Sequence, residues 1–147
     1  ISATRIRDAV AAGNLADARQ MLGRPAALFG NVVRGFGDAT KLLDAPTVNV
    51  ELQAGVLPPD GVYCGRAVLA GGKSYPAAIN IGVAPTFEGR GRRIEAHLID
   101  FQGDVYDETL QLDLCAFLRK EQKFSSVGEL KRQIAADLEE CRRSRRS

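Results

Sequence analysis

The sequence predicts a mainly β domain, in which an antiparallel sheet closes on itself and a C-terminal helix lies against it. Six short segments carry the alternating or apolar pattern of strands: residues 28–33, 47–52, 62–69, 75–81, 94–101 and 110–118. Turn signals separate these segments, and no helical pattern is interleaved between them. We expect the sheet to close because closure removes exposed strand edges.

Turn residues mark where the strands end. Pro58-Pro59-Asp60-Gly61 is a strong turn, residues 70–74 form a hairpin, and residues 85–92 are predicted to be a loop. The last strand alternates most clearly, with one set of side chains on a single face: Leu110, Leu112, Leu114, Ala116 and Leu118.

Helical signals lie at the two ends of the chain. Segments 2–13 and 14–23 each begin with a capping residue and end with glycine, which predicts two short helices. Near the C-terminus, Ser126 and Glu129 form a capping box before apolar residues at helical spacing: Val127, Leu130, Ile134, Leu138 and Cys141. This last helix is expected to lie on the barrel.

Composition limits the function classes. The 147 residues are 45% hydrophobic, enough for one compact core, and the net charge of +2 gives no strong field for nucleic acid or a membrane surface. The sequence shows neither a signal peptide nor an apolar run long enough to span a membrane. Cys64, Cys115 and Cys141 are odd in number and widely spaced. We therefore expect reduced, buried thiols, no zinc site and a cytoplasmic location.

The stretch from Asp44 to Asn49 is the first candidate for a functional site. Thr47 and Asn49 lie two residues apart after a proline, so in an extended segment their side chains share one face. Their oxygens are hard ligands of the kind that Mg²⁺ accepts beside substrate phosphates. The preceding loop, with Gly35, Gly37 and Lys41, offers backbone N–H groups and a cation for a phosphate. Taken alone, these stretches also fit a simple turn into a strand.

A second candidate lies in the strand over residues 94–99. Glu95 and His97 share one face of this strand, whereas Ile94, Ala96 and Leu98 take the other. A carboxylate that faces a pocket can accept the proton of an alcohol as it attacks a phosphate. An ordinary solvated strand residue is the alternative for Glu95, and His97 is assigned a structural role.

Five segments, in this order along the chain, closely resemble the riboflavin kinase family. They are Val32 to Gly37, Pro46 to Asn49, Leu57 to Tyr63, Glu95 to Leu98 and Leu118 to Phe124, and the resemblance runs from about Gly30 to Asp137. It implies a six-stranded Greek-key barrel with a C-terminal helix. It also implies transfer of the γ-phosphate of ATP to the ribityl 5′-hydroxyl of riboflavin with Mg²⁺, giving FMN and ADP.

The resemblance assigns roles to individual residues. Glu95 matches the proposed general base, and Thr47 and Asn49 match the ligands of magnesium and phosphate. The nucleotide pocket is implied for a further set: Gly35, Gly37, Lys41, Leu98, Asp100 and Tyr106. The flavin is implied to lie against Arg119, Gln122 and Phe124, where a ring and a guanidinium plane can pack on the isoalloxazine. Phe124 also fits a simple contact at the start of the last helix.

The N-terminal segment carries a second resemblance. Residues 1–7 are similar to the last motif of the nucleotidyltransferase half of bifunctional bacterial FAD synthetases, although Ala3 stands where serine is usual. We therefore expect residues 1–24 to be a helical remnant of such a domain and residues 25–147 to be the kinase domain. FMN adenylyltransferase activity is expected only in the full-length protein, with that N-terminal domain in cis.

Several residues depart from the family pattern. Asp44 and Ala45 replace a glycine and a large apolar residue, Asp38 and Ala39 replace Arg-Gly, and Asp107 stands where glycine is usual. Carboxylates near a triphosphate repel it unless a cation intervenes. A non-catalytic flavin-binding or regulatory relative is therefore the first alternative. A nucleic-acid-binding barrel is the second, although the near-neutral charge opposes it.

Overall fold

The structure is a computed structural model that describes residues 2–33, 47–86 and 89–143. Within these residues the elements follow in the order α1 (Ala3–Ala11), α2 (Leu15–Leu22), β1 (Ala26–Val33), β2 (Thr47–Ala54), β3 (Gly61–Leu69), β4 (Ser74–Thr86), β5 (Gly89–Leu98), β6 (Thr109–Arg119) and α3 (Val127–Arg143). The strands close into a barrel in the spatial order β1-β2-β5-β4-β3-β6, and every neighbouring pair is antiparallel. Because β2 lies beside β5, the predicted Greek-key barrel is confirmed.

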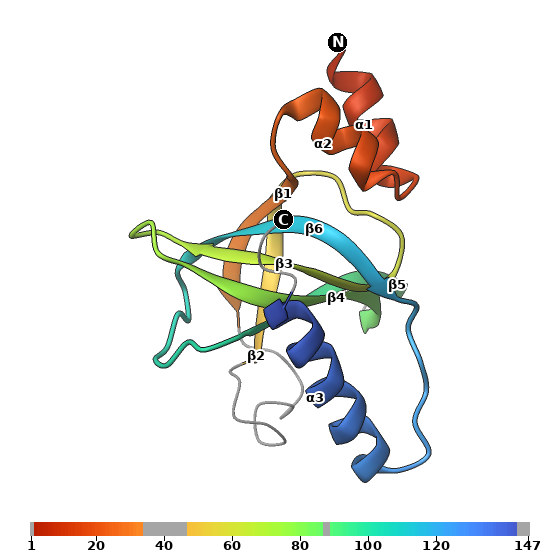
Figure 1. Ribbon diagram of the computed structural model, residues 1–147, viewed down its shortest axis with the longest axis vertical. Helices are drawn as coiled ribbons and strands as arrows, with labels where there is room; N and C mark the ends of the chain where they lie inside the picture. The colour runs from red at the N-terminus through yellow and green to blue at the C-terminus, as the bar shows by residue number, and fades with distance from the viewer. Residues whose placement is uncertain (1, 34–46, 87–88, 144–147) are drawn as a thin grey trace.

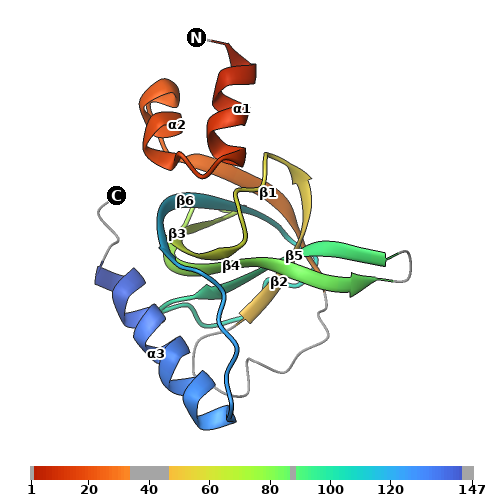
Figure 2. The ribbon, with the colours of Figure 1, turned by 90° about the vertical axis from the view of Figure 1, so that its right-hand side faces the viewer.

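The helices cover two parts of this barrel. Figure 1 shows α1 and α2 at one end and α3 against the side, and Figure 2 shows the same arrangement after a quarter turn. Ser2 caps α1 by accepting a hydrogen bond from the Arg5 N–H at 3.2 Å, and α2 ends at Gly23 with φ 77°. Val10 and Ala18 from this pair of helices are buried in the same cluster as the barrel core.

The interior of the barrel is apolar. Tyr63 is its largest fully buried side chain, and the largest aliphatic ones come from alternate positions of several strands: Leu28, Ile79, Ile81, Leu98, Leu112 and Leu114. The same strands direct their intermediate positions outward, so the barrel has a second, outer surface. That outer surface is where α3 lies.

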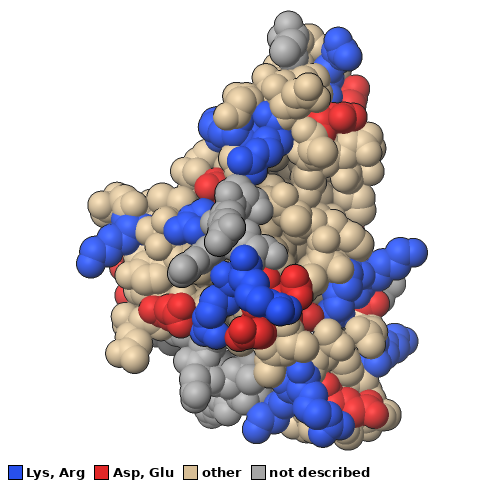
Figure 3. Space-filling model, in the orientation of Figure 1, with Lys and Arg blue, Asp and Glu red and all other residues tan. Residues whose placement is uncertain are grey.

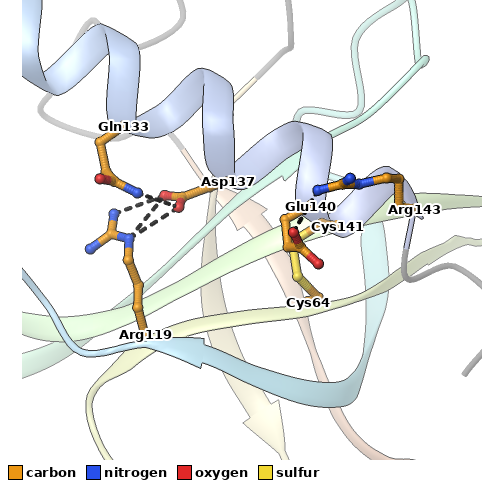
Figure 4. The surroundings of a disulfide bond; sticks show 7 residues. All are labelled: Cys64, Arg119, Gln133, Asp137, Glu140, Cys141 and Arg143. Atoms are coloured by element: carbon orange, nitrogen blue, oxygen red, sulfur yellow. Dashed lines mark hydrogen bonds and ion pairs between the residues drawn. A yellow bond between two sulfur atoms is a disulfide. The ribbon is translucent and has the colours of Figure 1, made fainter.

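A small outer cluster, a disulfide bond and an ion pair hold α3 against the barrel. Cys64, Ala78, Ile99 and Cys141 are buried together between the barrel wall and the helix. Cys64 and Cys141 form a disulfide bond, and Arg119 pairs with Asp137 on the same helix (Figure 4). The expectation of three reduced thiols was therefore wrong, because the fold brings together two cysteines that lie 77 residues apart. Cys115 remains a free cysteine.

Two predicted strand boundaries were also wrong. Most of the predicted loop over residues 85–92 is strand in the described residues: β4 continues to Thr86 and β5 begins at Gly89, with Thr86 opposite Gly89 in the ladder. The alternation of β6 holds from Leu110 to Leu114 and then lapses at the exposed Ala116. Register shifts against β3 lie in this part of the ladder, and an extra residue at a bulge reverses which face the next side chain takes.

Charged side chains of both signs are mixed on the face that Figure 3 shows, without a large region of one sign. In the described part of the chain, no helix is both long and apolar enough to cross a membrane.

Candidate active site

Five strands place their outward-facing residues in one line across the barrel wall. The ladder sets Asn49 opposite Glu95, and Glu95 opposite Asn80. Further round the barrel, Asn80 on β4 lies opposite Val62 on β3, and Val62 lies opposite Arg119 on β6. Directly opposed residues have Cβ atoms about 5 Å apart, so this line is a continuous strip of side chains. The predicted base lies between the predicted metal ligand and the predicted flavin contact.

A pocket of about 420 Å³ lies over the part of this strip from Glu95 to Arg119, and Asn49 is not in its lining. Its volume is within the usual size range for small-molecule sites. The barrel wall, the segment after β6 and α3 all contribute to its lining: Val62, Ala78, Asn80, Val83, Arg93, Glu95, His97, Arg119, Glu121, Gln122, Phe124, Leu130, Ile134 and Asp137. The predicted base and all three predicted flavin contacts are among them.

An ion pair with Arg93, two residues earlier on β5, holds the side chain of Glu95 in place. The Arg93 Nε lies 3.3 Å from the Glu95 Oε1, and the Glu95 side chain is 18% exposed. The pair limits the rotamers of Glu95, which lines the pocket.

Thr47 is fixed by His97 across the β2–β5 ladder. The Thr47 Oγ1 and the His97 Nδ1 share a hydrogen bond of 2.9 Å, and burial lowers the pKa of His97, while the Asp137 charge acts in the opposite direction. This hydrogen bond is compatible with the structural role predicted for His97, which stays a prediction. Because Thr47 and Asn49 present neutral hard oxygens on the same face of β2, their chemistry fits Mg²⁺. The described residues contain no cluster of three His, Cys, Asp or Glu side chains.

Arg119 is engaged by α3. Its Nε and the Asp137 carboxylate oxygens are 3.1 and 3.2 Å apart, and its Nη2 donates to the Asp137 Oδ2 at 2.8 Å. Gln133 donates to the same carboxylate at 2.9 Å, as Figure 4 shows. Asp137 is 6% exposed, so its charge is compensated inside the interface rather than by water. The ion pair fixes the plane of the guanidinium at the rim of the pocket.

Four predicted nucleotide-binding residues of the described chain lie outside the pocket lining, namely Thr47, Leu98, Asp100 and Tyr106, and so does the predicted metal ligand Asn49. Leu98 is fully buried in the barrel core, so only its backbone is available to a ligand. Asp100 pairs with Arg142 at 2.9 Å, and Tyr106 is 46% exposed. Gly35, Gly37 and Lys41 fall outside the described residues, as do Asp38, Ala39, Asp44 and Ala45. Their roles stay predictions.

The sequence reasoning missed three residues of this site. Asn80 is the one amide in the apolar run of β4, which is the signal that would have found it. Glu121 lies so close over Gly82 that a Cβ there would collide with its carboxylate. Asp137 carried no signal, because its partner Arg119 precedes it by 18 residues and faces it only in the folded chain.

Comparisons with known proteins agree with this geometry. The riboflavin kinase family model (Flavokinase) matches residues 22–145. The bifunctional riboflavin kinase/FMN adenylyltransferase of Escherichia coli K12 is 42% identical over 137 residues, which is 93% of this chain and 44% of that protein. The chain therefore spans less than half the length of this relative.

Two solved structures share the fold. The crystal structure of a riboflavin kinase from Trypanosoma brucei is 25% identical, with a TM-score of 0.57 over 82% of this chain and 79% of that one. A structure described as a macrolide-efflux protein from Streptococcus pneumoniae is 36% identical, with a TM-score of 0.86 over 97% of this chain and 46% of that one. The family match, the relatives and the barrel with its site agree, and the chain belongs to the riboflavin kinase family.

Proposed function

We propose that this chain transfers the γ-phosphate of ATP to the 5′-hydroxyl of riboflavin, giving FMN and ADP. The observation that carries the proposal is the position of Glu95 in the strip. Residues with phosphate and metal chemistry, Thr47 and Asn49, lie on one side of it, and Arg119 lies on the other. Phosphoryl transfer needs this order, because the reacting hydroxyl must lie between the nucleotide and the body of the acceptor.

Each residue of the site has a separate role in the proposed transfer. Glu95 accepts the proton of the 5′-hydroxyl while the oxygen forms its bond to the γ-phosphorus and the bond to the β,γ-bridging oxygen breaks. Thr47 and Asn49 would hold Mg²⁺, which neutralises phosphate charge when it is bound. His97 orients the Thr47 hydroxyl through their hydrogen bond. Gln122 and Phe124 hold the flavin from the segment between β6 and α3.

The test is FMN formation from riboflavin and Mg·ATP, followed by chromatography with the purified chain. Glu95→Gln keeps the shape of the side chain and removes the base, so we expect turnover to fall by about 10²- to 10⁴-fold. Glu108→Gln is the matched control, because Glu108 is exposed and lies outside the pocket lining. Turnover by Glu95→Gln at the control's rate would show that another group accepts the proton.

The same assay addresses the flavin-binding alternative. That alternative requires riboflavin to bind, with quenching of its fluorescence, and no FMN to form. The family match, and the pocket that holds Glu95 together with Arg119, Gln122 and Phe124, support the enzyme instead.

We also propose how the chain relates to a longer protein. The relative that is 42% identical is bifunctional and more than twice as long, which supports residues 1–24 as the connection to an N-terminal nucleotidyltransferase domain in cis and residues 25–147 as the kinase domain. FMN adenylylation would belong to that other domain. A cytoplasmic location is proposed because the reaction consumes ATP.

A further inference from the structure

Asn80 carries an unsatisfied polar atom at the centre of the strip. Among the described residues, its Oδ1 is the one buried side-chain oxygen or nitrogen without a hydrogen-bond partner. An unpaired buried carbonyl destabilises a fold, so one that persists in a pocket wall is explained when a ligand supplies the missing donor. Asn80 lines the 420 Å³ pocket, and χ2 of asparagine is a soft torsion that can turn this oxygen toward a ligand there.

The position of Asn80 restricts which part of the ligand it meets. It lies directly opposite Glu95 on one side and Val62 on the other, and Arg119 follows Val62. Riboflavin with its 5′-hydroxyl at Glu95 and its ring near Arg119 must therefore lay its ribityl chain across Asn80. Opposed strand residues have Cβ atoms about 5 Å apart, which is the span of roughly four carbon–carbon bonds of an extended chain, close to the length of the ribityl chain.

We propose that Asn80 is a specificity residue that accepts a hydrogen bond from a secondary hydroxyl of the ribityl chain. The oxygen is an acceptor, and the secondary hydroxyls are the donors that a flavin carries at this point. This inference rests on the proposed function, because it takes the position of the 5′-hydroxyl from Glu95. It predicts that the pocket selects a polyol chain over an alkyl chain of the same length, since an unpaired polar group disfavours the analogue.

The experiment compares two flavins by fluorescence quenching. Riboflavin is the first, and 7,8-dimethyl-10-(5-hydroxypentyl)isoalloxazine, which keeps the terminal hydroxyl and lacks the three secondary ones, is the second. Asn80→Ala is expected to weaken riboflavin binding by about five- to tenfold and binding of the analogue by less than about twofold. Asn80→Asp keeps an acceptor oxygen and is expected to retain the preference for riboflavin.

Asn31→Ala is the matched control, because Asn31 is a partly buried asparagine of β1 that lies outside the pocket. It should leave both dissociation constants unchanged. We also expect the melting temperature of Asn80→Ala to equal or exceed that of the wild type, because the substitution removes a buried polar atom without a partner.

Each remaining outcome has a defined meaning. Equal weakening of both flavins by Asn80→Ala, with wild-type binding intact, would overturn the assignment of Asn80 and leave the kinase proposal standing. Loss of the preference in Asn80→Asp as well would overturn the acceptor role. Wild-type protein that binds neither flavin would overturn the proposed function, and the assignment of Asn80 with it.

Discussion

The inside and the outside of the barrel wall differ in what holds them together. The interior is filled by aliphatic side chains that are almost completely buried, such as Leu28, Ile81 and Leu112. The outer side under α3 has only a small apolar cluster, and it relies on a disulfide and the Arg119–Asp137 ion pair. The interior therefore supplies most of the stability, because burial of apolar area is the dominant favourable contribution to folding.

One strand shows how close the two regions are. In β5, Ile94, Ala96 and Leu98 are buried in the core, whereas Glu95 and His97 line the pocket. Alternate residues of β5 therefore belong to the core and to the candidate site. A one-residue slip in register would exchange the two sets, so the packing of the core also fixes the position of the base.

The largest effect on stability is expected in the interior. Leu112 is fully buried, and Leu112→Ala should lower the free energy of unfolding by about 3 kcal/mol, because it leaves a cavity. Leu118→Ala is the same change in the same strand, on the partly buried outer cluster, and should cost about 1 kcal/mol. Urea denaturation of both variants measures the difference. Equal losses would show that the outer cluster is as important for stability as the core.

The next effect concerns the link between α3 and the barrel. Cys141→Ser removes the disulfide that closes a loop of 77 residues, and should lower the free energy of unfolding by about 2–3 kcal/mol. Because α3 supplies Leu130, Ile134 and Asp137 to the pocket, riboflavin binding should weaken as well.

The control for the disulfide is Cys115→Ser, which removes the free cysteine. Thermal melts with and without a reductant separate the variants. Wild type and Cys115→Ser should lose stability on reduction, and Cys141→Ser should be insensitive to it. A wild-type melting temperature that is the same under both conditions would contradict a stabilising role for the bond.

Much of the secondary structure could be predicted from the sequence, because helix caps and strand alternation depend on residues only a few positions apart. Ser2 caps α1, Gly23 ends α2, and Ser126 accepts a hydrogen bond from the Glu129 N–H at 3.1 Å, as expected of a capping residue. The alternation in β5 predicted that Glu95 faces away from the core. The pocket lining contains Glu95 together with Arg119, Gln122 and Phe124, although their roles stay predictions.

Contacts between distant segments were not predictable in this way. No local pattern indicates that Cys64 lies beside Cys141, or that Asp137 neutralises Arg119. The extension of β4 to Thr86 and the start of β5 at Gly89 depend on pairing between the two strands, which outweighed the turn signal of Pro85. The bulges in β6 are also a property of the ladder, so the simple alternation predicted the wrong face at Ala116.

A smaller effect is expected from the one histidine of the chain. Burial lowers the pKa of His97 below that of the unfolded chain, about 6.5, so the unfolded state binds the proton more readily. His97 thus favours folding above that value, and stability falls as the pH drops through it. Denaturant midpoints between pH 7.5 and 5.5 measure this slope, and His97→Gln should flatten it. An unchanged slope would assign the pH dependence to carboxylates.

The smallest effect concerns a residue where the sequence departs from its family. Asp107 has φ 68°, in the left-handed region that glycine adopts without strain, and its N–H donates to the Val32 carbonyl at 3.0 Å just before β6. Asp107→Ala should lower the free energy of unfolding by about 1 kcal/mol, because alanine lacks the local hydrogen bonds that help aspartate tolerate this conformation. In Asp107→Gly, relief of strain opposes the greater freedom of the unfolded chain, so the net change should stay within about 0.5 kcal/mol. Glu108→Ala, at the next exposed position, is the control for loss of a carboxylate. Equal losses in Asp107→Gly and Asp107→Ala, both above that of Glu108→Ala, would show that the aspartate side chain, and not relief of backbone strain, decides the stability of this turn.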